Sequence, residues 1–199
     1  MKKQIIAIHG GDTFETYEQY LEFLKNFPID FERLKKRGWK DSLGEKLGSD
    51  FDVFIPRMPN SLNAKYPEWK IWIEKLIPFF DEEIILLGHS LGGTFIVKYL
   101  SENTLPKKIK ATFLVAACYD GDNSEYSLGS FKLPEAIEGF KKQAGKVFLY
   151  QSKDDDLVPF ADFEKYKIAL PEASARVFEN RGHFGQEDFP EIVTDIKSL

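Results

Sequence analysis

Residues 84–93 read IILLGHSLGG, and this stretch decides the fold. Its apolar start predicts a short buried strand, and residues 91–100 carry apolar side chains at helical spacing. Between the two lies a Gly-x-Ser-x-Gly pattern centred on Ser90. This order of strand, tight turn and helix is typical of a nucleophile elbow, which holds the serine in a strained backbone conformation. Gly88 and Gly92 suit it because larger side chains beside so sharp a turn would collide.

Ser90 has two interpretations, a nucleophile or a serine that only caps the following helix. The strand before it and the helix after it favour the nucleophile. A helix N-terminus also favours negative charge that develops beside it. We therefore expect Ser90 to attack a substrate, and a serine needs a base within hydrogen-bond reach to do so.

The base has few candidates, because the chain contains only 3 histidines. His89 lies inside the elbow, where its side chain should point away from that of Ser90, and His9 ends the first apolar run. His183 lies between the last expected strand and the last expected helix. The base is found there when the catalytic residues occur in the order serine, acid, histidine. We predict that His183 is the general base.

The acid that orients the histidine should follow the preceding strand. Residues 152–160 read SKDDDLVPF, and the common pattern D-x-x-V-P selects Asp155. An acidic cluster can also bind a metal ion, but no histidine or cysteine lies beside this one, so we predict no metal site. The alternatives for the acid are Asp154 and Asp156, and more remotely Asp120 and Asp122.

A tetrahedral oxyanion needs two hydrogen-bond donors in place before it forms. The backbone N–H of Leu91, directly after the nucleophile, is the first that we expect. The second should come from the loop after the first strand, where two glycines let the backbone approach the substrate. We predict Gly11 as this donor, with Gly10 as the alternative.

The rest of the chain alternates short apolar runs with longer stretches of helical spacing. This alternation predicts a doubly wound α/β fold, with a mostly parallel central sheet of about six strands and helices on both faces. The expected strands are 5–8, 53–55, 84–87, 112–116, 147–150 and 175–178, and the clearest expected helices are 66–80, 91–100 and 189–199.

We expect one domain over residues 1–199, since the length suits a single core and no linker or repeat interrupts it. Two segments depart from the alternation. Residues 14–37 read as a helical insertion, and residues 119–145 are mixed and then helical from Leu133. Each is a candidate lid or pocket wall, and an ordinary surface connection is the alternative.

Composition limits the function further. The formal net charge is −5, which provides no basic field for nucleic acid, and the basic run 33–37 is expected to be a solvated helix face. The single cysteine, Cys118, excludes an internal disulfide and fits a reducing compartment, so we expect a cytoplasmic protein. The apolar run near the N-terminus is too short for a signal peptide, and no run predicts a membrane span.

With these residues identified, the chain resembles the α/β-hydrolase superfamily over nearly its whole length. Within it, the chain is most similar to the small serine hydrolase family of retinoblastoma-binding serine hydrolase and YdeN-like proteins. Three segments carry that resemblance: RMPN at 57–60 with Trp69 after it, SKDDDLVPF at 152–160, and RGHF at 181–184. The chain departs from the family pattern after Gly10, where a long segment precedes the tryptophan helix at Trp39.

The resemblance implies a compact α/β-hydrolase fold, a Ser90–Asp155–His183 triad and esterase-like activity. We expect a carboxylesterase-like serine hydrolase that cleaves small carboxylic esters or thioesters through an acyl-enzyme. The alternative is a protein-binding module on the same fold with little or no turnover, although nothing in the sequence supports a particular protein partner. Nothing implies a nucleotide, flavin or metal cofactor. The expected pocket walls are Phe14, Met58, Leu133, Phe160 and Phe184, although a residue of this kind is more often part of a core.

Overall fold

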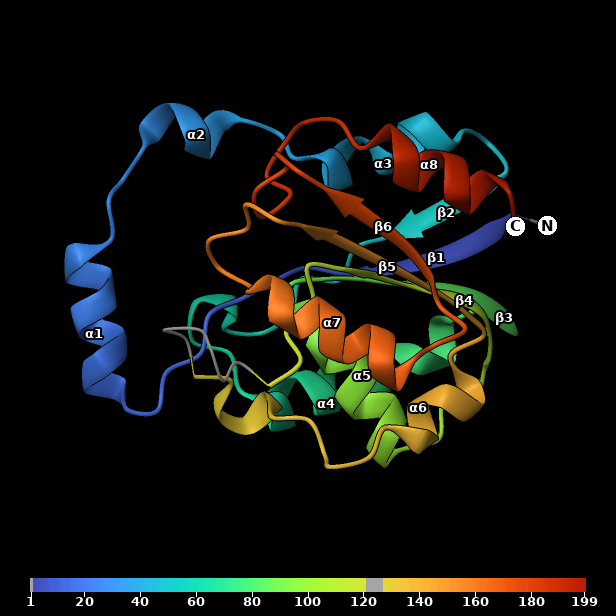
Figure 1. Ribbon diagram of the computed structural model, residues 1–199, viewed down its shortest axis with the longest axis horizontal. Helices are drawn as coiled ribbons and strands as arrows, with labels where there is room; N and C mark the ends of the chain where they lie inside the picture. Colours follow the sequence, from blue (N-terminus) through green and yellow to red (C-terminus); the bar gives the residue numbers. More distant parts are fainter. Residues whose placement is uncertain (1, 121–126) are drawn as a thin grey trace.

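The computed structural model describes residues 2–120 and 127–199. Six strands form one sheet in the order β2-β1-β3-β4-β5-β6, and every neighbouring pair is parallel (Figure 1). The predicted fold class is therefore confirmed. The strands are β1 (Lys3–Ile8), β2 (Phe51–Phe54), β3 (Glu83–His89), β4 (Lys108–Val115), β5 (Lys146–Ser152) and β6 (Ser174–Phe178).

Helices cover both faces of this sheet, α3 and α8 on one side and α4 to α7 on the other (Figure 1). Alternate side chains of β1 explain the arrangement: Ile5 and Ala7 are buried in one hydrophobic cluster, while Ile6 and Ile8 are buried in the other. The α-helices are α1 (Tyr17–Asn26), α2 (Phe31–Lys35), α3 (Trp39–Leu47), α4 (Tyr66–Leu76), α5 (Leu91–Glu102), α6 (Glu138–Gln143), α7 (Phe160–Ala169) and α8 (Pro190–Lys197).

The strand order reverses beside β1, because the chain runs outward to β2 on one side and from β3 to β6 on the other. In open parallel sheets, ligands bind at the carboxyl ends of the strands near such a reversal. The loops after β1, β3, β5 and β6 all leave the sheet at this edge. These are the loops that contain the predicted site residues.

Several helix boundaries differ from those expected, and prolines account for most of the differences. The helix expected over 66–80 ends at Leu76, and a 3-10 turn with Pro78 follows it. The expectation of helix from Leu133 is wrong, since α6 begins at Glu138, beyond Pro134. Part of the 119–145 segment, residues 121–126, lies outside the described residues.

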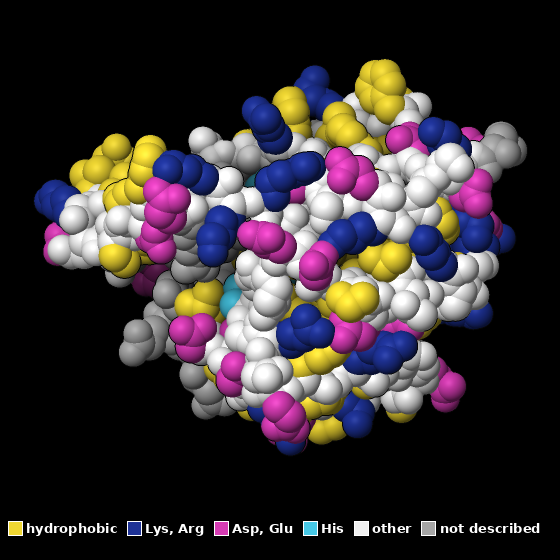
Figure 2. All heavy atoms as spheres, turned by 90° about the horizontal axis from the view of Figure 1, so that it is seen from above, with side chains coloured by type: hydrophobic (Ala, Val, Ile, Leu, Met, Phe, Trp, Pro, Cys, Tyr) yellow, Lys and Arg dark blue, Asp and Glu magenta, His cyan; other side chains and the backbone are white. Residues whose placement is uncertain are grey.

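The 14–37 segment forms two short helices, α1 and α2, with Pro28 between them. A capping box joins Thr16 to Gln19 and fixes the start of α1. No residue of α1 is buried, and the segment projects from the rest of the molecule with apolar side chains on its surface (Figures 1 and 2). We call residues 14–37 the arm.

Candidate active site

The turn between β3 and α5 has the strained geometry that the elbow motif predicts. Ser90 has φ 55° and ψ −129°, a region that residues other than glycine rarely adopt. Its N–H donates to the Val115 carbonyl at 2.8 Å, which anchors the turn to β4. A Cβ at Gly88 would lie 2.5 Å from the Gly93 Cα, and one at Gly92 would lie 2.3 Å from the Ile8 carbonyl oxygen. A side chain at either position would collide with neighbouring backbone atoms, so both positions require glycine.

Ser90 lines a cavity of about 70 Å³ at the carboxyl edge of the sheet. Gly11 and Leu91 line the same cavity, so both expected oxyanion donors lie beside the expected nucleophile. In the part of the chain that the structure describes, the Gly11 N–H donates to no backbone acceptor. A Cβ at Gly11 would lie 2.6 Å from the Ser61 carbonyl oxygen, which explains why this position is glycine.

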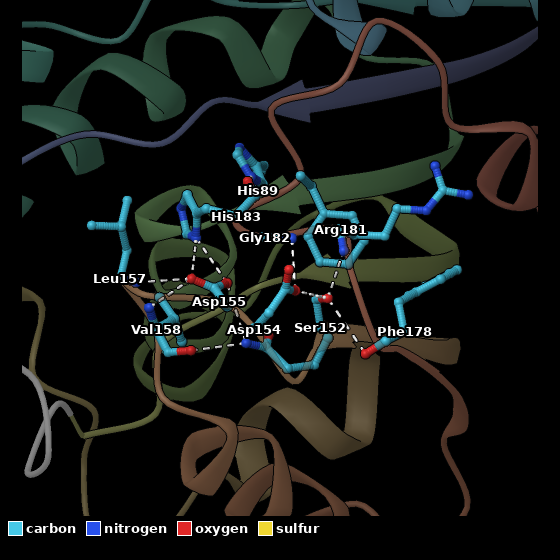
Figure 3. A network of polar contacts seen from close by, with 12 residues as sticks. His89, Ser152, Asp154, Asp155, Leu157, Val158, Phe178, Arg181, Gly182 and His183 are labelled. Atoms are coloured by element: carbon cyan, nitrogen blue, oxygen red, sulfur yellow. Dashed lines mark hydrogen bonds and ion pairs between the residues drawn. The ribbon is translucent and has the colours of Figure 1, made fainter.

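Asp155 and His183 meet across the loops after β5 and β6 (Figure 3). The Asp155 Oδ2 lies 2.9 Å from His183 Nδ1, and Oδ1 lies 3.1 Å from the same nitrogen. The N–H groups of Leu157 and Val158 each donate to Asp155 Oδ1 at 3.0 Å. The Asp155 side chain is fully buried, whereas that of His183 keeps 18% exposure. This carboxylate is thus held by two backbone donors while it contacts the imidazole.

The neighbouring aspartates have other roles. Asp154 accepts hydrogen bonds from the Ser152 hydroxyl and from the Gly182 N–H, and these two donors, the hydroxyl first, lower the pKa of its carboxyl. It thereby joins the β5 loop to the loop that contains His183 (Figure 3). Asp156 is exposed, Asp120 pairs with Lys165, and Asp122 lies outside the described residues.

The two remaining histidines form structural contacts. The Met58 N–H donates to His9 Nε2 at 3.0 Å. His89 Nε2 lies 3.0 Å from the His183 carbonyl oxygen, and the two rings are 4.9 Å apart between centroids. His89 thus holds the backbone of the residue expected to act as base.

Lys40 is a site residue that the sequence motifs did not predict. It lies on α3, and its Nζ is 2.8 Å from His89 Nδ1. Burial lowers the pKa of Lys40 to about 8, and burial followed by the nearby Lys40 charge lowers the pKa of His89 well below its usual value. A neutral His89 therefore accepts from Lys40 at Nδ1 and donates from Nε2 to the His183 carbonyl. No sequence signal pointed to this contact, because it joins residues 49 positions apart.

Within residues 2–120 and 127–199, no hydrogen bond links the Ser90 hydroxyl to His183. Hydrogen bonds between nucleophile and base are often long without substrate and shorten when it binds. The contacts of His89 place the His183 ring next to the elbow, beside the residue that precedes Ser90.

The five expected pocket walls lie outside the described lining of the cavity beside Ser90. Phe184 is buried against Phe189, and the Phe184 carbonyl accepts a hydrogen bond from Trp39 Nε1 at 3.0 Å. Met58 belongs to the other core cluster, against which Leu133 and Phe160 pack. Phe14 packs on Phe23 within the arm. The cavity is instead lined by Gly11, Asp12, Thr13, Ser90, Leu91, Cys118, Ser127, Leu128, Leu157 and Val158.

A protein-family model described as serine hydrolase matches residues 31–191, which is more than half of the chain. The chain belongs to the serine hydrolase family. The match begins after α1 and includes the elbow and the loops of Asp155 and His183. This serine hydrolase is 27% identical to serine hydrolase RBBP9 of Rattus norvegicus over 151 residues, 75% of this chain and 78% of the relative. It is 28% identical to the putative hydrolase YdeN of Bacillus subtilis over 193 residues, 94% and 89% of the two chains.

Solved structures share the fold of this serine hydrolase. The crystal structure of the B. subtilis ydeN product superposes with a TM-score of 0.78 at 21% identity, covering 99% of this chain and 98% of that one. A thioesterase domain from the curacin biosynthetic pathway gives a TM-score of 0.64 at 14% identity, covering 100% and 91%. These likenesses confirm the α/β-hydrolase fold.

Among the described residues, no group of three or more histidine, cysteine, aspartate or glutamate side chains is arranged to hold a metal ion. None of the described helices combines the length and the apolar character needed to cross a membrane.

Proposed function

We propose that this serine hydrolase cleaves small carboxylic esters or thioesters through an acyl-enzyme, with Ser90 as nucleophile, His183 as base and Asp155 as acid. One observation carries the proposal: the buried Asp155 carboxylate contacts His183 Nδ1 at 2.9 Å at the sheet edge where the strained Ser90 faces a cavity. A strained backbone conformation persists only where the surrounding structure holds it, and such residues cluster at active sites.

In the proposed reaction, the Ser90 oxygen attacks the substrate carbonyl while His183 Nε2 takes the hydroxyl proton. The negative oxygen that forms is bound by the N–H groups of Gly11 and Leu91. The ester or thioester bond then breaks, and His183 returns the proton to the departing alcohol or thiol. Water attacks the acyl-enzyme in the same way, which releases the acid and restores Ser90. Asp155 keeps the imidazole in the tautomer that leaves Nε2 free to accept the proton.

The size of the cavity favours a small acyl group, because about 70 Å³ leaves room for only a few water molecules. Proteins of this fold include carboxylesterases of an ammonia-oxidizing thaumarchaeon and a thioesterase domain from the curacin biosynthetic pathway, both of which agree with acyl transfer. We therefore favour carboxylesterase-like specificity.

We further propose that residues 1–199 act as one domain in the cytoplasm, and that the arm and the described part of the 119–145 segment, at Ser127, border the entrance to the site. The contacts at the base of the arm support the last point. Lys65 Nζ donates to the Phe14 carbonyl at 2.7 Å, and the Ser127 hydroxyl donates to Glu15 at 3.2 Å. Ser127 also lines the cavity.

The test compares kcat/KM for a benzyl ester, a benzyl thioester and a benzyl amide of the same short acid, on wild type and Ser90→Ala. We expect turnover of the ester and thioester, little turnover of the amide, and loss of all turnover in a folded Ser90→Ala. A folded wild type that cleaves none of them would instead favour a binding module on a hydrolase fold.

A further inference from the structure

The arm exposes much apolar surface to solvent. Six of its large apolar side chains keep between 37% and 71% of their surface exposed: Tyr17, Leu21, Leu24, Phe27, Ile29 and Phe31. Apolar side chains gather on this projecting part of the molecule in Figure 2. Exposed apolar residues that stand singly are ordinary, but a contiguous group of them marks an interaction surface.

The helix α1 contributes one face of this surface. Tyr17, Leu21 and Leu24 follow one another at offsets of four and three residues, so they lie on the same side of the helix. No residue of α1 is buried, and a ten-residue helix without packing is marginal in water. This face therefore gains stability from a partner that covers it.

The charges of the arm are divided between its two halves. In the sequence, residues 15–26 contain three glutamates and one lysine, whereas residues 27–37 contain four basic and two acidic residues. The first half is thus net acidic and the second is net basic by the same amount. Glu18 and Glu22 are exposed in the first half, as are Lys35, Lys36 and Arg37 in the second. Two such arms that lie side by side in opposite directions are complementary in charge.

We propose that the arm is the interface of a homodimer, in which the arms of two copies pack antiparallel about a two-fold axis. Such an axis places the same surface on both subunits, so the acidic half of each arm faces the basic half of the other. The two apolar faces are buried between them. A stable interface takes roughly 20–30 residues from each side, and the arm has about that length.

A groove at the base of the arm gives the pairing complementary shape. Tyr17 and Tyr20 line a groove of about 550 Å³ together with Leu62 of the 3-10 turn η1 (Ser61–Asn63). In the antiparallel pairing this end of the arm faces Ile29 and Phe31 of the second copy, which are the two most exposed of the six apolar side chains. Apolar side chains that fill such hollows contribute much of the binding energy of an interface.

A lipid surface fits the arm less well than a second copy does. Helices that lie in a membrane surface carry lysine and arginine on their polar face, which anionic headgroups attract. The helix α1 instead carries Glu18 and Glu22 beside its single lysine, Lys25. Anionic headgroups would repel this half of the arm, so the charge pattern favours a second copy.

The first measurement is sedimentation equilibrium of the wild-type chain over a range of concentrations. We expect the mass of one chain in dilute solution and twice that mass in concentrated solution. The Kd should be on the order of 1–10 µM, because the arm alone forms the interface. A single-chain mass even at roughly a hundredfold above that range would overturn the inference.

Two paired charge reversals test the orientation of the arms. Glu18→Lys with Glu22→Lys makes both halves basic, and Lys35→Glu with Lys36→Glu makes both halves acidic. Each pair alone should raise the Kd at least about tenfold at low salt, because like charges then face each other. An equimolar mixture of the two variants should dimerise as wild type does, because opposite charges face each other again. Since no residue of α1 is buried and Lys35 and Lys36 are exposed, both variants should fold.

Lys142→Glu with Lys146→Glu is the matched control, because it makes the same change of charge at exposed positions outside the arm. It should keep the wild-type Kd. Leu24→Glu, in the middle of the apolar face, should instead be monomeric.

Three results would overturn the inference besides a monomeric wild type. A dimer that neither paired reversal nor Leu24→Glu weakens would form through another surface. Reversed variants that stay monomeric when mixed would exclude the antiparallel pairing. A monomeric wild type that sediments with vesicles of phosphatidylcholine and phosphatidylserine would assign the arm to a lipid surface.

Discussion

The loops at the carboxyl edge of the sheet and the arm at residues 14–37 are held in opposite ways. At the edge, buried groups are joined across the sequence: Asp155 contacts His183, and the His89 imidazole links Lys40 to the His183 carbonyl. In the arm, α1 has no buried residue, and Tyr17 and Ile29 keep 62% and 71% of their surface exposed. The edge can hold catalytic groups in place because many contacts determine each of them.

The boundary between the two regions is sharp. Phe31 of the arm is 66% exposed, whereas Trp39, at the start of α3, is only 2% exposed. A ten-residue helix such as α1 is marginal in water without packing, so the arm contributes little to the stability of the fold. Substitutions at the edge should therefore change catalysis or stability strongly, and those in the arm should not.

The largest expected effect is at Asp155. Asp155→Asn should lower kcat for a benzyl ester by about 10⁴-fold, because the amide no longer holds the imidazole in the productive tautomer. Asp154→Asn is the matched neighbour, since an amide oxygen can still accept from Ser152 and Gly182, and it should lose less than about tenfold. The reverse ranking would assign the acid to Asp154.

The next effect compares two aromatic residues on either side of the boundary. Trp39→Ala should lower the free energy of unfolding by about 3–5 kcal/mol, because it empties a core position and removes the hydrogen bond to Phe184. Tyr17→Ala in the arm should change it by less than about 0.5 kcal/mol. Urea unfolding of both variants measures the difference, and similar losses would mean that the arm packs as firmly as the core.

A smaller effect concerns the stability contribution of Lys40 as a function of pH. Its pKa is about 8 in the folded protein and near 10.5 in the unfolded chain, so between these values the unfolded chain binds more protons. The free energy of unfolding should therefore rise with pH across this window. Because a tenfold change in proton affinity corresponds to roughly 1.4 kcal/mol, Lys40→Gln should be more stable than wild type near pH 7 by on the order of 1–2 kcal/mol.

That advantage should disappear by about pH 10.5, where the lysine has lost most of its charge in the folded protein and is titrating in the unfolded chain. Lys36→Gln in the arm is the control, and its free energy of unfolding should change with pH in parallel with that of wild type. If the free energy of unfolding of Lys40→Gln also stays parallel to that of wild type as the pH changes, then the burial of charged Lys40 does not lower the stability of the fold.

Much of the candidate site could be predicted from the sequence, because its residues lie in local motifs. The elbow was recognisable since a strand, two glycines and a helix must surround Ser90, and all of them are contiguous. Asp155 differs from its two neighbours by its spacing to Val158 and Pro159, which selects it as the proposed acid. In the structure, its carboxylate lies 2.9 Å from His183 Nδ1.

What the sequence did not predict depends on contacts between distant segments. Lys40 reaches His89 only because α3 packs over the sheet edge. The pocket walls were missed for the same reason: an aromatic residue such as Phe184 can pack into the core or line a pocket without any change in its local pattern.

The central claim is that the edge holds an activated Ser90. The most direct measurement is covalent labelling with a fluorophosphonate probe, with the intact mass of wild type and Ser90→Ala read after reaction. We predict one adduct on wild type and none on the variant, with both proteins folded. Wild type that is folded but unlabelled, or a variant that is labelled as fully as wild type, would contradict the claim.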